Sequence, residues 1–140
     1  RVLFRSRRAS VALGDIRPTL ERLAAAGLKI GIATNDAEGP ARRDMEHIGV
    51  ADLCDVIYGH DSHGAKPGPE MMEAFCAETG LQPDQVAMVG DTMTDLRFAR
   101  NAGAHSCIGI IDPSYANQPF VEGVDVQVEH VDAIPALLGL

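Results

Sequence analysis

The stretch that most constrains this chain is an apolar run that ends at a glycine and is followed by two carboxylates. Residues 86–89 are short and uncharged, as expected for a strand buried on both faces of a parallel sheet. Gly90 lets the backbone turn sharply at the carboxyl end of that strand. Asp91 then lies at the sheet edge where α/β proteins bind ligands, and Asp95 follows about one helical turn later on the same side. The spacing predicts a site for a hard divalent cation such as Mg²⁺.

A plainer interpretation fits the same two carboxylates. Asp91 could cap the helix that follows, and Asp95 could be a solvated acid in its first turn. Both arrangements are common in helices, so the choice depends on what the rest of the chain offers.

The composition limits the class of protein. The chain has 140 residues, of which 46% are apolar, enough for the core of one domain or of a large piece of one. A net charge of −8 argues against a nucleic-acid or membrane-surface partner, but not against a small phosphorylated ligand. The three cysteines are far apart and form no C-x-x-C motif, which is typical of reduced thiols in the cytosol. No run is apolar enough to span a membrane and no signal peptide is evident, so we expect a cytoplasmic protein.

Apolar runs and helical patterns alternate along the chain. We predict strands at 28–33, 54–58, 86–89, 106–111 and 126–128. We predict helices at 15–26, 37–48, 68–79, 94–102 and 133–138, and a polar loop at 59–68. Because the connections are too long for hairpins, the pattern indicates an α/β fold: a Rossmann-like parallel sheet with helices on both faces.

Polar groups follow two of these strands and occupy the polar loop. Thr34 and Asn35 follow one strand, Asp91 and Asp95 follow another, and Lys66 lies in the loop. A hydroxyl and backbone N–H groups can hold phosphoryl oxygens, a lysine supplies a compact positive charge, and carboxylates hold Mg²⁺. Taken singly, Thr34 could begin a turn and Lys66 could be solvated. As a set we expect these side chains to converge at the carboxyl edge of one sheet.

The same residues lie in motifs that resemble those of the haloacid dehalogenase-like (HAD) hydrolase superfamily, in its phosphoglycolate-phosphatase-like branch. Three stretches carry the likeness: 32–35 (Ile-Ala-Thr-Asn), 65–70 (Ala-Lys-Pro-Gly-Pro-Glu) and 89–95 (Val-Gly-Asp-Thr-Met-Thr-Asp). The resemblance implies catalytic roles for Thr34 and Lys66, with Asn35 helping them to bind the substrate phosphate. It also implies that Asp91 and Asp95 organise Mg²⁺.

The family implies a Mg²⁺-dependent phosphomonoesterase that acts on a small phosphorylated metabolite through an aspartyl-phosphate. Receiver domains also place Asp, Thr and Lys at strand ends, but in a different order along the chain. The alternative that we keep is a non-catalytic remnant that binds a phosphorylated ligand or partner without turnover.

One departure from the family pattern concerns its first motif, D-x-D-x-T on the central strand, which has no counterpart before Thr34. The first Asp of that motif is the nucleophile and the second is the general acid/base. The only Asp before Thr34 is Asp15, at the start of a predicted helix, so we expect no turnover of phosphate esters by this chain.

The helical cap that this branch inserts after its first motif is also missing, so we interpret the chain as N-terminally truncated. We expect residues 1–8 to be a non-native or frayed terminus and residues 9–140 to be the C-terminal part of the HAD-like core. The central first strand should then be absent. Its place should be an open gap or should be filled by Val2–Phe4.

Overall fold

The computed structural model describes residues 2–4, 16–110 and 123–140. Its strands are β1 (Val2–Phe4), β2 (Ile30–Ala33), β3 (Val56–Tyr58), β4 (Ala87–Gly90), β5 (Ser106–Ile110) and β6 (Val126–Val128). Its α-helices are α2 (Arg17–Ala25), α3 (Glu38–Ile48), α4 (His60–His63), α5 (Glu70–Thr79), α6 (Met93–Ala102) and α7 (Ile134–Leu137). Short 3₁₀ turns are η1 (Ala51–Leu53), η2 (Pro83–Gln85) and η3 (Val131–Ala133).

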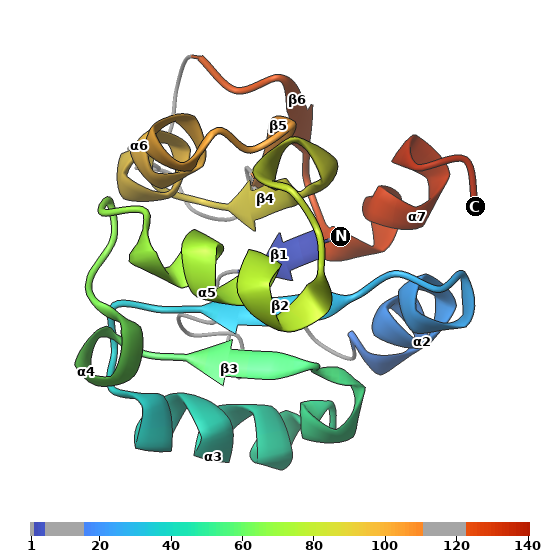
Figure 1. Cartoon of the computed structure of the whole chain (residues 1–140). Coiled ribbons are helices and arrows are strands. Elements are labelled where there is room, and N and C mark those ends of the chain that lie inside the picture. The colour runs from blue at the N-terminus through green and yellow to red at the C-terminus, as the bar shows by residue number, and fades with distance from the viewer. Residues whose placement is uncertain (1, 5–15, 111–122) are drawn as a thin grey trace.

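The described strands form one parallel sheet in the order β3-β2-β1-β4-β5-β6. In Figure 1 the arrows of β1 to β4 all point the same way, so the carboxyl ends of these strands share one edge. Strand β1 occupies the centre, with Phe4 level with Ile32 of β2 and with Val89 of β4. Of the two outcomes that we predicted for the central place, filling by Val2–Phe4 is confirmed. The origin of residues 1–8 stays a prediction, and positions 1 and 5–8 lie outside the described residues.

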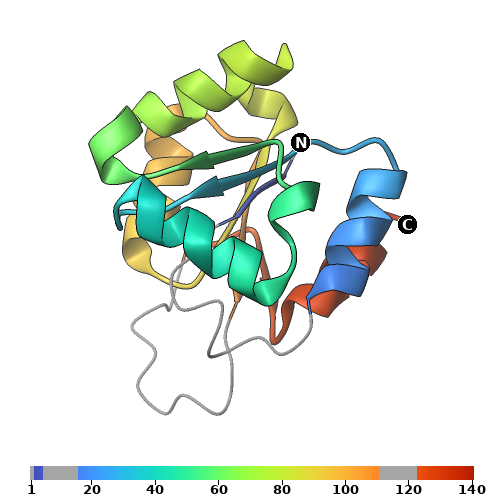
Figure 2. The same cartoon turned by 90° about the horizontal axis from the view of Figure 1, so that it is seen from below.

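Helices cover both faces of the sheet, as the alternating pattern predicts. Figure 2 shows α3 and α5 on opposite sides of the strands. On one face, α2, α3 and α7 contribute the buried side chains of Leu20, Met45 and Ile134. On the other face, α5 and α6 contribute Phe75 and Phe98. Successive β4 residues point alternately to these two faces, so the sheet is buried on both sides. A ligand can therefore reach the sheet only at its edges.

The predicted elements differ from the observed ones mainly at their ends and in one loop. The segment 59–68, predicted as a polar loop, contains one helical turn, α4, because the Ser62 hydroxyl and the Gly59 backbone exchange hydrogen bonds across it. The helix predicted from Asp15 begins at Arg17, and Asp15 itself lies outside the described residues. Among the described residues, no helix combines the length and the apolar character that a membrane span requires.

Candidate active site

A polar cavity of about 300 Å³ lies at the carboxyl edge of the sheet. It is lined by Thr34, Asn35, Asp36, Lys66, Thr92, Thr94 and Asp95. The end of β2, the segment before α5 and the first turn of α6 therefore meet there. The structure brings four of the predicted residues to one cavity: Thr34, Asn35, Lys66 and Asp95. The fifth, Asp91, directly follows β4 beside the cavity, and its backbone N–H donates to the Asp95 carboxylate at 3.1 Å.

A buried ion pair joins two walls of this cavity. The Nζ of Lys66 lies 2.7 Å from Oδ1 of Asp95, and the two side chains are only 2% and 0% exposed. The same Nζ donates to the Ala33 carbonyl at 2.9 Å, so the amine is tied to the end of β2 as well as to α6. Lys66 is therefore not the solvated lysine of the plainer interpretation. Its buried charge is retained because it is paired with Asp95 and hydrogen-bonded to the Ala33 carbonyl.

The second carboxylate oxygen of Asp95 organises the turn that follows β4. Oδ2 accepts hydrogen bonds from the Asp91 N–H, the Thr92 N–H and the Thr92 hydroxyl, at 3.1, 3.3 and 3.0 Å. In return, Oγ1 of Thr92 accepts from the Asp95 N–H at 3.3 Å, so Thr92 is the N-cap of α6 and Asp95 completes a capping box. The plainer interpretation, in which Asp91 caps the helix and Asp95 is solvated, is therefore wrong.

Gly90 is needed for a reason other than the one predicted. It is the last residue of β4 and is not one of the glycines with positive φ, so it makes no special turn. A Cβ added at Gly90 would come within 2.5 Å of the Asp95 Cγ, whereas real Cβ contacts are essentially never under 3.0 Å. The missing side chain lets the buried Asp95 carboxylate lie directly against the strand.

Thr34 presents its hydroxyl at the end of β2. Its side chain is buried, and Oγ1 accepts a hydrogen bond from the Asp36 N–H at 3.0 Å, so its own hydrogen can be donated to a ligand oxygen. The segment after Thr34 is held from outside by Asp61, whose Oδ1 accepts from the Glu38 N–H at 2.9 Å. That hydrogen bond is the main reason why the pKa of Asp61 lies below its usual range. Gly59 lets the two segments touch, since a Cβ there would meet the backbone of Asp36.

Sequence reasoning missed two residues that shape this site. Thr92 could have been found, because Thr three residues before an acidic residue is the signature of a capping box. Asn101 on α6 donates to the Pro67 carbonyl at 2.9 Å, a long-range contact that no local pattern reveals. His63, the last residue of α4, packs its ring against Tyr58 with centroids 3.9 Å apart and is not among the cavity-lining residues.

Within the described ranges, no three His, Cys, Asp or Glu side chains form a ready-made metal cluster. Mg²⁺ does not require one, because it is commonly held by one or two carboxylates together with substrate phosphate and water. Asp91 is half-buried at the sheet edge, whereas both oxygens of Asp95 accept hydrogen bonds from the protein. The carboxylates at this sheet edge therefore fit a Mg²⁺ ion that phosphate and water also coordinate. The assignment of both Asp91 and Asp95 to the metal stays a prediction.

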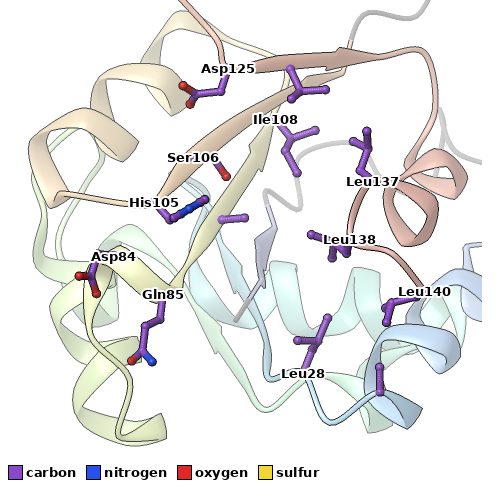
Figure 3. Close-up of a pocket in the computed structure, with 13 residues that line it drawn as sticks. Leu28, Asp84, Gln85, His105, Ser106, Ile108, Asp125, Leu137, Leu138 and Leu140 are labelled. Atoms are coloured by element: carbon purple, nitrogen blue, oxygen red, sulfur yellow. The ribbon is translucent and has the colours of Figure 1, made fainter.

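A larger cavity, of about 720 Å³, lies at the opposite edge of the sheet, at the amino ends of β4 and β5 (Figure 3). Leu28, Leu137 and Leu138 form an apolar wall, and Asp84 and His105 come from the other side. None of the motif residues lines this cavity. The candidate site is therefore the smaller, polar cavity, where the motifs meet.

Comparison with known proteins shows which family this chain resembles. Residues 3–103 match the family model of the haloacid dehalogenase-like hydrolases. The chain is 38% identical over 101 residues to a phosphoglycolate phosphatase of Rhodospirillum rubrum, covering 71% of this chain and 41% of that protein. It is 32% identical over 109 residues to an N-acetylmuramic acid 6-phosphate phosphatase of Pseudomonas aeruginosa, covering 75% and 47%.

A solved structure with the same fold is a HAD phosphatase from Thermococcus onnurineus. The superposition has a TM-score of 0.78 at 27% identity and covers 89% of this chain and 57% of that one. The chain spans less than half the length of these two curated relatives.

Proposed function

Because this chain belongs to the haloacid dehalogenase-like hydrolases, we propose that its polar cavity is the phosphoryl-binding part of a Mg²⁺-dependent phosphomonoesterase. The observation that carries the proposal is the buried Lys66 amine, fixed at 2.7 Å from Asp95 in the wall of the cavity that Thr34 also lines. Phosphoglycolate and N-acetylmuramic acid 6-phosphate, named for two relatives, are small phosphomonoesters. A small phosphorylated metabolite is accordingly the proposed substrate class.

Each residue has a role that follows from its position. Thr34 donates its O–H to a non-bridging phosphoryl oxygen, and the buried Lys66 ammonium offsets the negative charge on the same group. Asp95 fixes Lys66 and the first turn of α6. Asp91 would hold Mg²⁺, which would supply further positive charge to stabilise the phosphoryl group.

The nucleophile is the part that this sequence lacks. The residues that follow β1 at D-x-D spacing are Arg5 and Arg7, and a guanidinium cannot accept a phosphoryl group as a carboxylate does. We therefore expect this chain to bind phosphate without turning esters over. A parent protein with an aspartate at the first position would form an aspartyl-phosphate and hydrolyse it.

The first test is binding of inorganic phosphate to the chain by calorimetry, with and without Mg²⁺. We expect Mg²⁺ to strengthen binding, and Thr34→Val and Lys66→Met to weaken it about tenfold or more, as loss of a hydrogen bond to a charged group implies. Thr79→Val is the matched control, because that hydroxyl donates to the Phe75 carbonyl of its own helix, away from the cavity. Equal phosphate binding by wild type and Lys66→Met would contradict the proposal.

The second test restores the missing carboxylates. The chain with Arg5→Asp and Arg7→Asp should hydrolyse p-nitrophenyl phosphate in the presence of Mg²⁺, and Asp91→Asn or EDTA should abolish that activity. The chain with Arg5→Asn and Arg7→Asn changes the same charges without supplying a nucleophile and should stay inactive. Mg²⁺-dependent turnover by the unmodified chain, purified to homogeneity, would show that the nucleophile has been misidentified.

A further inference from the structure

Lys66 differs from the other cavity residues in the element that carries it. Thr34 follows a strand directly and Asp95 lies in a helix, whereas Lys66 belongs to the irregular segment between α4 and α5. In Figure 1 this segment runs from the β3 side of the sheet up to the level of α6. An irregular segment does not fix a side chain by itself, so other contacts must determine where the amine points.

The backbone of that segment is held by the amide groups of two asparagines. Asn35 bonds both polar backbone groups of Lys66: its Nδ2 donates to the Lys66 carbonyl at 3.0 Å, and its Oδ1 accepts from the Lys66 N–H at 2.7 Å. Asn101 donates from Nδ2 to the carbonyl of the next residue, Pro67, at 2.9 Å. Together these three bonds tie the segment to the end of β2 and to α6.

The amine end of Lys66 is tied to the same two elements. Its Nζ donates to the carbonyl of Ala33, at the end of β2, and to Oδ1 of Asp95, in the first turn of α6. The side chain is thus fixed at both ends between β2 and α6. A shift of the backbone would pull the amine away from these two partners. Separating a buried charge from its partners is strongly destabilising.

We infer that Asn35 and Asn101 are positioning residues: they hold the backbone at Lys66 and Pro67 so that the Lys66 amine faces the phosphoryl cavity. The role of the Lys66 amine in phosphate binding rests on the proposed function, whereas the hydrogen bonds that hold Lys66 do not. Positioning Lys66 also gives the Asn35 side chain a role different from direct phosphate binding. Its Oδ1 and Nδ2 each bond the Lys66 backbone, and the second Nδ2 hydrogen is a further donor at the cavity that Asn35 lines.

The chain offers a direct readout that needs no phosphate. Lys29 and Lys66 are its two lysines, and Lys29 is exposed whereas Lys66 is buried. Reductive methylation with ¹³C-formaldehyde, followed by NMR, therefore compares the reactivity of Lys66 with an internal reference. We expect Asn35→Ala to raise the labelling rate of Lys66 about tenfold relative to Lys29, and Asn101→Ala, which removes one bond instead of two, to raise it about threefold.

The matched control is Arg100→Gln. Arg100 neighbours Asn101 on α6 and is also exposed, but its hydrogen bonds go to Asp125 and to the Gly123 carbonyl. Its substitution should leave the relative labelling of Lys66 unchanged even if it lowers global stability. Unchanged labelling of Lys66 in both asparagine variants, or an equal rise in Arg100→Gln, would overturn the inference.

Phosphate binding then separates positioning from direct contact. In the wild-type background, Asn35→Ala and Asn101→Ala should each weaken the binding of inorganic phosphate with Mg²⁺ present. In the Lys66→Met background neither should weaken it further, because both act through Lys66. An undiminished loss for Asn35→Ala in that background would assign Asn35 to the ligand instead. If wild type binds no phosphate, the proposed function fails, and the labelling result still decides whether the asparagines position Lys66.

Discussion

The ion pair between Lys66 and Asp95 yields a quantitative prediction about stability. Lys66→Met keeps the apolar stem but removes the ammonium, and with it the hydrogen bonds to Asp95 and to the Ala33 carbonyl. Both charged side chains are at most 2% exposed, so water cannot replace the lost partner. Breaking a buried pair in this way typically costs about 3–5 kcal/mol, and we expect a loss of that size in the free energy of unfolding.

The double variant tests whether the loss arises from the unpaired charge. Asp95→Asn alone should cost a similar amount, because it leaves the Lys66 ammonium buried beside a neutral amide. Combined with Lys66→Met, it removes both charges, and the amide oxygen can still accept from the Asp91 and Thr92 N–H groups. We expect the double variant to be more stable than Lys66→Met alone by about 1–3 kcal/mol, since a neutral replacement of a buried pair is often tolerated.

Urea unfolding followed by far-UV circular dichroism is the appropriate assay, because the chain has no Trp to report by fluorescence. Lys29→Met is the matched control: the same substitution at an exposed lysine should change stability by about 0.5 kcal/mol or less. A loss below about 1 kcal/mol for Lys66→Met would refute the reasoning. So would a double variant whose loss equals the sum of the two single losses, because independent side chains add in that way.

Other features of the structure lead to three further predictions. Gly90→Ala should destabilise the chain by about 1–3 kcal/mol in the same urea assay, because the added Cβ would overlap a buried carboxylate. Gly39→Ala is the control and should be neutral or stabilising, because its Cβ would meet the end of an arginine side chain at 3.6 Å. Burial raises the pKa of the Cys107 thiol to about 12, so at pH 8 iodoacetamide should alkylate the half-buried Cys76 well before Cys107; equal rates by mass spectrometry would contradict this. A hydrogen bond from the Cys107 N–H is the main reason why the pKa of Asp125 is lower in the folded chain than in the unfolded chain. The Asp125 carboxylate therefore stabilises the fold at a pH above the pKa of the unfolded chain, and this contribution is lost as the pH falls through the pKa of the folded chain. Asp125→Asn should therefore be less stable than wild type at pH 7 and equal to it near pH 2, and a difference that persists at low pH would contradict the assignment.

The features that the sequence determined by itself are those that repeat over a few residues. A short uncharged apolar run predicted β4, and helical spacing with a terminal glycine predicted α3 up to Gly49, because periodicity reports which side of an element is buried. Thr34, Lys66 and Asp95 were predicted to meet from the rule that parallel strands end at one edge.

Only the tertiary structure decided how these residues are held. Asn35 and Lys66 are 31 positions apart, and Asn101 and Pro67 are 34 apart, so their hydrogen bonds depend on how β2 and α6 pack and leave no periodic trace in the sequence. The same holds for the use of Gly90, which is explained by the distance to the Asp95 carboxylate and not by backbone torsion. Strand β1 illustrates the limit most clearly: three apolar residues can occupy an edge, a terminus or a centre, and pairing with β2 and β4 on both sides decides which.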